Sequence, residues 1–149
     1  EVTLTESNVY IGGGNSDHNT AETIKFFAAA DRTTTTGTQI MEVDVNEVNF
    51  MQGQKVNRTT VADADYTVLV TDYIIAYTSI TTTRTLTLPA AATAGEGKVY
   101  HIKNESGSAQ TITIDGNGSE TIDGSTTQSI SGGYDAVSIY SDGSNWFIF

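Results

Sequence analysis

The chain has 149 residues, no cysteine and a net charge of −11, from 7 basic and 18 acidic residues. Its length allows one domain or two small units, and the lack of cysteine excludes disulfides and thiol chemistry. The acidic excess argues against electrostatic binding to nucleic acid or to an anionic membrane surface. No apolar run reaches the roughly 18 to 20 residues that cross a bilayer, so we expect no membrane insertion.

The first residues, Glu1 to Leu4, have neither the basic region nor the apolar stretch of a secretion signal, and no initiator methionine precedes them. We therefore expect a mature piece or fragment of a longer protein. Threonine, valine, isoleucine and tyrosine favour strands because branched and aromatic side chains pack well on a pleated surface. Together with frequent glycine turns and a single proline, they predict an all-β protein.

The first 57 residues carry short, thinly apolar segments. Residues 22–30 end in three alanines and could be a helix. Their alternation, and a length below the roughly 12 to 15 residues at which isolated helices become marginal, favour a strand. A threonine-rich turn at 31–37 and a strand at 39–45 follow. This region cannot close a core alone, so we expect it to pack against copies of itself, with a boundary near residues 53–60.

The remaining residues alternate apolar and polar side chains with a period of two, which is typical of strands. We predict strands at 66–70, 73–78, 84–88, 99–103, 111–114, 136–140 and 146–149. The first leads through Thr71-Asp72 into the second. Residues 90–97 are predicted to be a loop and residues 104–109 a turn. Asp-Gly and Asn-Gly steps after residue 113 supply the positive-φ corners of hairpins.

The segment VYIGGGNSDHNTAETIKFFAAADRTTTTGTQIMEVD resembles the shaft segments of tailed-phage tail fibres and tail spikes. The part from YTVLVTDYIIAY to SDGSNWFIF is similar to a small β-domain at the ends of many phage tail proteins. The resemblance implies a strand pair around Thr71-Asp72-Tyr73, and Thr-Leu-Pro, Ile-Lys-Asn, Thr-Ile-Asp, Ile-Asp-Gly and Ser-Asp-Gly-x-x-Trp follow there in order. One departure is Val48 to Gly53, which stands where the shaft pattern has a further Ile-Gly turn; no self-cleaving chaperone is visible.

The resemblance implies a short fibrous β-shaft at 1–57 and a β-sandwich-like terminal knob at 58–149, intertwined as a homotrimer. It implies a structural virion appendage, extracellular on the virion, that attaches to the host surface by multivalent contacts. The expected partners are copies of itself, other tail or virion proteins and host cell-surface glycan, with no nucleic acid. The apolar residues expected to face the trimer axis or a neighbouring chain are Val9, Ile11, Ile24, Phe26, Ile40 and Val43.

Two alternatives stay open. The chain could be a purely structural adaptor or decoration of a virion, or a carbohydrate-binding module of a secreted enzyme. Absence of binding to any host cell would favour the first alternative, and a monomer that binds soluble sugar would favour the second.

No catalytic site, metal site or cofactor is predicted. Residues 115–120 carry oxygen side chains at alternate positions, as half of an EF-hand loop does, but the sixth position is not glycine and no bidentate glutamate follows. Residues 12–17 echo a calcium-binding repeat that needs stacked copies. His18 and His101 are isolated, with no Gly-x-Ser-x-Gly elbow. No two carboxylates are paired by sequence, as glycoside hydrolysis requires.

Sugar binding is the site chemistry that the sequence supports best, because aromatic faces stack on sugar rings and polar side chains bind hydroxyls. The candidate receptor- or glycan-binding residues are Tyr134, Tyr140, Asp142 and Asn145. Trp146 could join them, but we expect it to close the core with Phe147 and Phe149, and we expect Asp142-Gly143 to be a hairpin turn. The loops at 90–98, 104–109 and 115–125 are further candidates, because loops carry recognition on rigid scaffolds.

Overall fold

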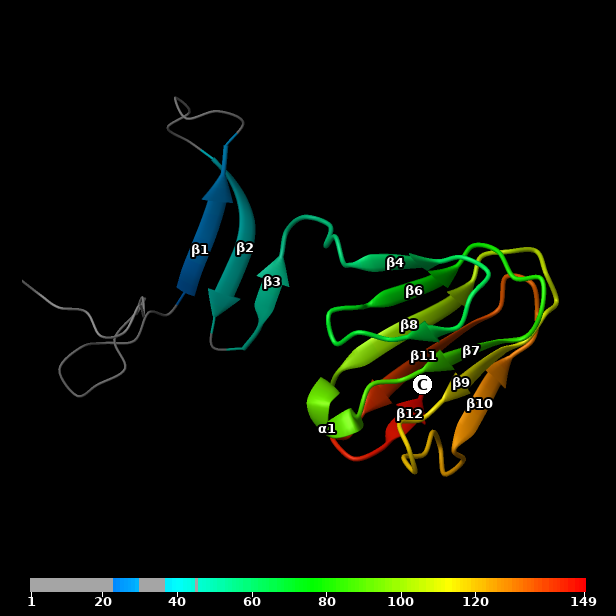
Figure 1. The fold of residues 1–149 in the computed structure, drawn as a ribbon. Coiled ribbons are helices and arrows are strands. Elements are labelled where there is room, and N and C mark those ends of the chain that lie inside the picture. Colours follow the sequence, from blue (N-terminus) through cyan, green and yellow to red (C-terminus); the bar gives the residue numbers. More distant parts are fainter. Residues whose placement is uncertain (1–22, 30–36, 45) are drawn as a thin grey trace, which may run out of the picture. The chain divides into compact units, whose positions relative to one another are not determined.

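The computed structural model describes residues 23–29, 37–44 and 46–149 (Figure 1). It divides the chain into two compact units, Glu1–Lys55 and Val56–Phe149. The described residues form strands and one four-residue helix, which confirms the prediction of an all-β protein. The elements are β1 (Thr23–Ala28), β2 (Thr38–Asp44), β3 (Val48–Phe50), β4 (Arg58–Val61), β5 (Tyr66–Thr67), β6 (Ile74–Tyr77), β7 (Arg84–Thr87), α1 (Ala91–Ala94), β8 (Val99–Asn104), β9 (Ile112–Asp115), β10 (Thr127–Ile130), β11 (Ala136–Ser141) and β12 (Trp146–Ile148).

The N-terminal unit contains one antiparallel sheet with the order β1-β2-β3. The strand predicted within residues 22–30 is confirmed, and its helical alternative is wrong. The strand predicted at 39–45 is confirmed as far as Asp44. The predicted turn lies outside the described residues up to residue 36. The Asp44 carboxylate accepts hydrogen bonds from the Asn46 and Glu47 backbone N–H groups, which holds the turn into β3.

Strand register gathers six apolar side chains on one face of this sheet, whereas Phe27, which follows Phe26 in β1 and is 58% exposed, alternates to the opposite face. Ile24, Val43 and Val48 form one cross-strand row, and Phe26, Met41 and Phe50 form the next. Lys25, Glu42 and Asn49 form the row between them, and alternation along each strand points that row to the opposite face. We call the six apolar residues the apolar face. It includes Ile24, Phe26 and Val43 of the residues expected at a trimer axis, but Ile40 lies in neither row.

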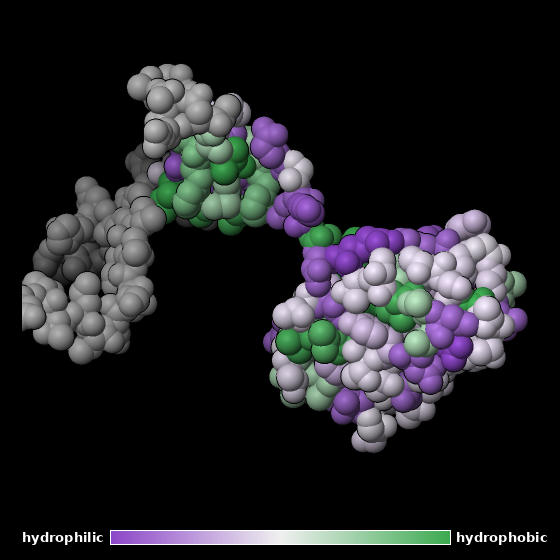
Figure 2. Space-filling model, turned by 45° about the horizontal axis from the view of Figure 1, so that its top comes forward, coloured by the Kyte–Doolittle hydropathy of each residue, from purple (hydrophilic) through white to green (hydrophobic). Residues whose placement is uncertain are grey.

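Part of the apolar face is open to solvent in the single chain. Val48 is 54% exposed and Phe50 is 49% exposed. In Figure 2, hydrophobic residues gather on the described surface of this unit, whereas the visible face of the C-terminal unit is mostly of intermediate hydropathy, with separated hydrophobic and hydrophilic patches. Within the described residues of the N-terminal unit, no second layer of strands or helices covers the sheet.

The C-terminal unit contains two sheets, and the chain alternates between them from β4 to β9 (Figure 1). The five-stranded sheet has the order β12-β11-β8-β6-β4, and the four-stranded sheet has the order β10-β9-β7-β5. Each strand from β6 to β9 pairs in parallel with the strand two places before it. β10, β11 and β12 then pair antiparallel with their neighbours. The chain therefore crosses back and forth between the two sheets up to β9, and its last three strands add to the sheets in antiparallel pairs.

The predicted strands at 84–88, 99–103, 111–114, 136–140 and 146–149 correspond to β7, β8, β9, β11 and β12 within one residue at each end. β4 and β10 are absent from the prediction, because Arg-Thr-Thr-Val and Thr-Gln-Ser-Ile show little apolar alternation. The predicted loop at 90–97 contains the single helical turn α1.

The predicted strand pair around Thr71-Asp72 is wrong, because β5 and β6 lie in different sheets. The Asp72 carboxylate is buried and accepts hydrogen bonds from the Thr59 hydroxyl at 2.5 Å, the Tyr66 hydroxyl at 2.8 Å and the Leu69 N–H at 2.8 Å. A buried carboxylate needs such donors. Their positions in β4, β5 and the following loop tie the two sheets together where the chain crosses between them.

One hydrophobic cluster draws side chains from both sheets. Its members are Val61, Val68, Ile75, Tyr77, Ile80, Leu86, Leu88, Ala91, Tyr100, Ile102, Ile112, Ile114, Ile122, Ile139 and Trp146. The core role predicted for Trp146 is confirmed, because its side chain is fully buried and its indole N–H donates to Glu120 at 3.3 Å. The same role is wrong for Phe149, which is 67% exposed, and Phe147 is only half-buried.

The Asp-Gly and Asn-Gly corners behave as predicted at several positions. Gly118, Gly124 and Gly143 have positive φ, which glycine adopts without strain. Asp123, with φ of 49°, also protects the edge strand β12: its N–H donates to the Trp146 carbonyl, and its carboxylate accepts from the Ile148 N–H. Occupied edge groups oppose pairing with a further strand at these positions.

Candidate functional site

The four predicted binding residues fall at the two ends of β11. Tyr134 precedes this strand, whereas Tyr140 lies near its end and Asp142 and Asn145 lie in the following turn. The two tyrosines are six positions apart in the chain, which corresponds to at most about 20 Å at the usual rise per residue of a strand. The structure therefore brings Tyr140, Asp142 and Asn145 together on one end and leaves Tyr134 on the other.

Tyr140 belongs to an aromatic patch on the outer face of the five-stranded sheet. Its ring stacks on Phe147 at 5.5 Å between centroids and meets Phe149 edge-on at 5.8 Å. Tyr140 and Phe149, with Gly97 and Val99, line an open hollow of about 400 Å³ whose walls are almost entirely apolar. We call Tyr140, Phe147, Phe149 and Val99 the aromatic patch. Its chemistry suits an apolar surface of another protein better than the hydroxyls of a sugar.

Asp142 and Asn145 shape the turn between β11 and β12, as the predicted Asp142-Gly143 hairpin requires. One Asp142 carboxylate oxygen accepts from the Ser144 N–H at 2.8 Å and from the Asn145 N–H at 2.7 Å. These backbone hydrogen bonds lower the pKa of Asp142. The Asn145 side-chain oxygen accepts from the Thr121 N–H and hydroxyl at 2.9 and 3.0 Å. These acceptor atoms already serve the fold.

Tyr134 lies on a different surface, formed by two loops that approach each other closely. A Cβ on Gly133 would lie 2.6 Å from the Gly107 carbonyl oxygen, so only glycine allows this approach. The Tyr134 N–H donates to the Ser106 carbonyl at 3.3 Å, and the Lys103 ammonium donates to the Tyr134 carbonyl. We call Ser106, Gly107, Ser108 and Gly132 to Asp135 the Tyr134 ledge.

The Asn104 side chain forms hydrogen bonds to both loops of the Tyr134 ledge. It is only 1% exposed. Its side-chain N–H₂ donates to the Ser108 and Gly132 carbonyls, each at 2.9 Å. Its side-chain oxygen accepts from the Ser106 N–H at 3.0 Å and from the Ser106 hydroxyl at 2.7 Å. One buried amide thereby uses both donors and its acceptor to fix the ledge.

The predicted recognition loop at 104–109 thus forms part of the ledge that carries Tyr134. The loop at 90–98 contains α1 and borders the aromatic patch through Gly97. In the loop at 115–125, the Glu120 carboxylate accepts from the Ala91 N–H at 2.9 Å and from Trp146, which is a structural role. Val9, Ile11, His18 and residues 12–17 lie outside the described residues.

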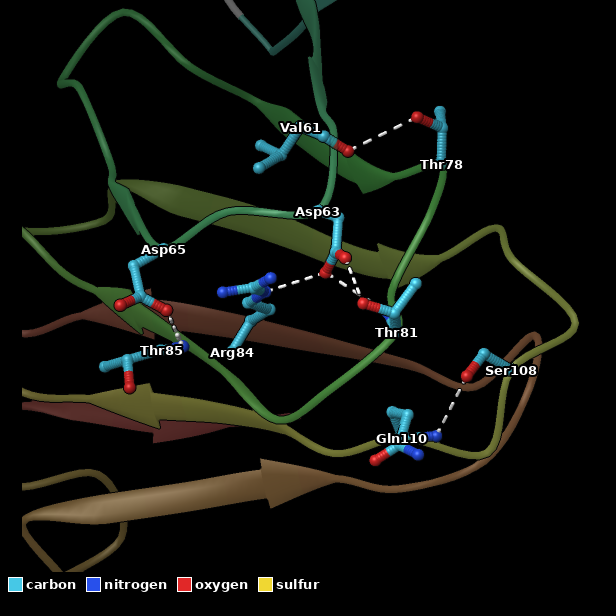
Figure 3. A network of polar contacts seen from close by, with 9 residues as sticks. All are labelled: Val61, Asp63, Asp65, Thr78, Thr81, Arg84, Thr85, Ser108 and Gln110. Carbon is cyan, nitrogen blue, oxygen red and sulfur yellow. Dashed lines mark hydrogen bonds and ion pairs between the residues drawn. The ribbon is translucent and has the colours of Figure 1, made fainter.

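Other carboxylates fix the corners of the C-terminal unit (Figure 3). Asp63 accepts from the Arg84 Nε at 2.7 Å and from the Thr81 N–H at 3.1 Å, and it also bonds to the Thr81 hydroxyl. The Arg84 side chain, followed by Thr81, holds the pKa of Asp63 well below its usual range. Asp65 accepts from the Thr85 N–H at 2.8 Å. These contacts join the loop after β4 to the start of β7.

His101 makes the cross-strand contacts predicted for it. Its ring meets Tyr73 edge-on at 5.0 Å, and its Nδ1 lies 2.7 Å from the Ser138 hydroxyl. In the described ranges, no three histidine or acidic side chains gather closely enough to hold a metal ion. No helix in the same ranges has the length and hydropathy to cross a membrane.

Sequence reasoning missed Phe147 and Phe149 as surface residues and Asn104 as the support of a candidate site. Strict alternation from the buried Trp146 would have placed Phe147 outward. Asn104 stands out in the sequence only as the last residue of the Ile-Lys-Asn motif, and its supporting role is not visible there because its partners come from Ser106, Ser108 and the distant Gly132. Neither a scan against protein-family models nor a search of curated proteins found a match to the chain.

Proposed function

We propose that the chain is part of a trimeric virion appendage of the tail-fibre kind, in which a short shaft carries a β-sandwich-like knob that attaches to a host surface. The observation that carries this proposal is the apolar face of the N-terminal sheet. Two complete cross-strand rows of apolar side chains lie on one side, and Val48 and Phe50 are about half exposed in the single chain. Such a surface is stable in water when another apolar layer covers it.

A second copy of the same chain supplies that layer most simply. Each copy presents an identical sheet, and three such sheets turned inward would enclose Ile24, Phe26, Met41, Val43, Val48 and Phe50 in a shared core. The opposite row of Lys25, Glu42 and Asn49 would face solvent, with an ion pair of 3.6 Å between Lys25 and Glu42. The arrangement agrees with the resemblance to fibre shafts.

The C-terminal unit suits the role of the knob. Its two sheets share a closed hydrophobic cluster, so it does not need a partner to bury a core. It exposes an aromatic patch and the Tyr134 ledge on well-supported loops and strands, and in a trimer each surface would occur three times. Three weak contacts on one particle raise the overall avidity, because later contacts form at high effective concentration.

The test is the mass of the full chain in solution, measured by light scattering before and after mild heating. We expect a heat-resistant trimer. Replacing Val48 and Phe50 by serine should convert it to a monomer, because the apolar face is then interrupted. Asn49→Ser, on the same strand but on the opposite face, is the matched control and should remain trimeric. A monomeric wild-type chain would overturn the proposed assembly.

The carbohydrate-binding module is a second candidate, and the exposed Tyr134 is the observation that favours it. Such a module would be monomeric and would bind soluble sugar without any assembly. The same light-scattering measurement separates the two functions, because a monomer that binds sugar supports the module and a trimer supports the fibre.

A further inference from the structure

We propose that the Tyr134 ledge binds a neutral saccharide, with the Tyr134 ring stacked on the face of one sugar ring. The inference rests on the proposed attachment function and commits it to one surface and one class of receptor. It separates Tyr134 from Tyr140, which the sequence grouped with it.

The backbone at Tyr134 is the first step of the argument. Its φ is +66°, a left-handed conformation that large side chains adopt rarely. The two glycines before it, Gly132 and Gly133, do not have positive φ, so the left-handed position falls on the tyrosine itself. A tyrosine at a position that suits glycine points to a use for its ring.

The core does not use this ring. Tyr134 is 65% exposed, and its ring is absent from the hydrophobic cluster and from the residues packed against it. Part of the ring rests on Gly107: a Cβ at that glycine would lie 3.3 Å from the tyrosine hydroxyl. The rest of the ring is open to solvent. This contact restricts the ring position while leaving surface for a ligand.

The supporting loops are rigid. Buried Asn104 bonds to both loops, and the close approach of Gly107 and Gly133 leaves no room between them. The Lys103 ammonium holds the Tyr134 carbonyl. A preformed aromatic surface loses little conformational entropy when a ligand binds, which favours affinity for a small ligand.

The surroundings of the ring decide between ligand classes. Tyr134 is the one large apolar side chain exposed on the two loops, which also carry the exposed Asp135 and the half-buried Ser106, whose hydroxyl donates to Asn104. One flat apolar surface on otherwise polar loops matches a sugar ring, which has an apolar face and a rim of hydroxyls. A protein partner would need a larger apolar centre, such as the aromatic patch. The net charge of −11 favours a neutral saccharide over a polyanionic one.

The test measures binding of the full chain to maltooligosaccharide, galactooligosaccharide and chitooligosaccharide by calorimetry, together with its melting temperature. Tyr134→Gly should raise the dissociation constant of whichever saccharide binds the wild-type chain by at least about tenfold. Its melting temperature should stay the same or rise, because glycine relieves the backbone strain. Tyr134→Phe should keep binding, since the ring face remains. Tyr140→Ser is the matched control on the aromatic patch and should also keep binding.

Three results would overturn the inference: wild-type binding to none of the three saccharides, unchanged binding by Tyr134→Gly, or a melting temperature of Tyr134→Gly that falls by several degrees. The last result would mean that the ring supports the fold. The mass of the wild-type chain is measured by light scattering in parallel. A trimer that binds none of the saccharides removes the ledge but leaves the proposed appendage, whereas a monomer that binds none of them removes both proposals.

Discussion

The two units of the chain use the same strand pattern but bury their apolar side chains to different degrees. In the C-terminal unit, inward-facing residues of two sheets meet in one cluster, and members such as Ile75, Leu86 and Ile139 are fully buried. In the N-terminal unit, one sheet places six apolar residues on a face that remains partly open among the described residues. Alternation therefore specifies which face is apolar, whereas a second layer decides whether that face becomes a core.

The largest expected effect of a single substitution lies in the closed core. Leu86→Ala removes a fully buried side chain from β7 and leaves a cavity between tightly packed neighbours. We expect the free energy of unfolding of the C-terminal unit to fall by about 2–5 kcal/mol, as for other buried leucines. Urea unfolding of the full chain measures this loss, and it should be the same at low and high protein concentration.

Phe26→Ala tests the other side of the comparison. If copies of the chain cover the apolar face, we expect the N-terminal unit to lose about 1–3 kcal/mol of stability, and the loss should depend on protein concentration, because assembly and folding are linked. The measurement is urea unfolding at two concentrations a hundredfold apart. A loss that is independent of concentration would show that Phe26 packs within its own chain and would weaken the proposed assembly.

Acid should lower stability differently through the Asp63–Arg84 ion pair of the C-terminal unit and the Glu42–Lys25 ion pair of the N-terminal unit. Arg84 and Thr81 lower the pKa of Asp63 in the folded chain, so on acidification the Asp63 carboxylate is protonated in the unfolded chain before it is protonated in the folded chain. The ionised Asp63 therefore stabilises the fold at neutral pH, and this contribution is lost as the pH falls below about 4. Asp63→Asn should reduce the acid sensitivity of unfolding. Glu42→Gln should change it less, because the Glu42 and Lys25 side chains are 3.6 Å apart and Lys25 is exposed, whereas Asp63 lies 2.7 Å from Arg84. Urea unfolding from pH 7 to pH 3 compares the two variants, and equal effects would contradict the expectation.

The strands that sequence reasoning found are those with strong alternation, because their inward and outward residues differ in polarity. The winding between sheets could not be found in this way. The crossing at Asp72 depends on three donors from Thr59, Tyr66 and Leu69, and a polar residue after a strand resembles an ordinary hairpin turn in sequence. Parallel pairing of strands two places apart also leaves no local signal.

The candidate site shows the same limit. Tyr134 and Tyr140 are only six residues apart in the sequence, which suggested one cluster, but an extended strand carries them to opposite ends of a sheet. Asp142 and Asn145 were selected as polar partners of a sugar, and their oxygens accept hydrogen bonds from the turn itself and from Thr121. Sequence identifies residue types that suit a ligand, while the competing bonds within the fold become visible only in three dimensions.

The smallest effect is expected where the closed core contains a polar atom. The Tyr77 hydroxyl is the one buried side-chain polar atom without a hydrogen-bond partner in the part of the chain that the structure describes. Burial raises the pKa of Tyr77 from about 10 to about 12. Tyr77→Phe removes the unpaired hydroxyl and keeps the ring, so we expect stability at pH 7 to change by less than about 1 kcal/mol, toward stabilisation.

The same substitution has a larger effect in alkali. Because the pKa of Tyr77 is raised in the folded chain, the Tyr77 hydroxyl loses its proton in the unfolded chain at a lower pH than in the folded chain. The contribution of Tyr77 to wild-type stability is therefore fully present below pH 10 and declines as the pH rises toward 12. Tyr77→Phe should decline less over this range, which urea unfolding at pH 8 and pH 11 measures. A clear loss of stability at pH 8 would show that the hydroxyl has a partner, such as a buried water molecule, and that the closed core of the C-terminal unit contains a polar network rather than an apolar interior alone.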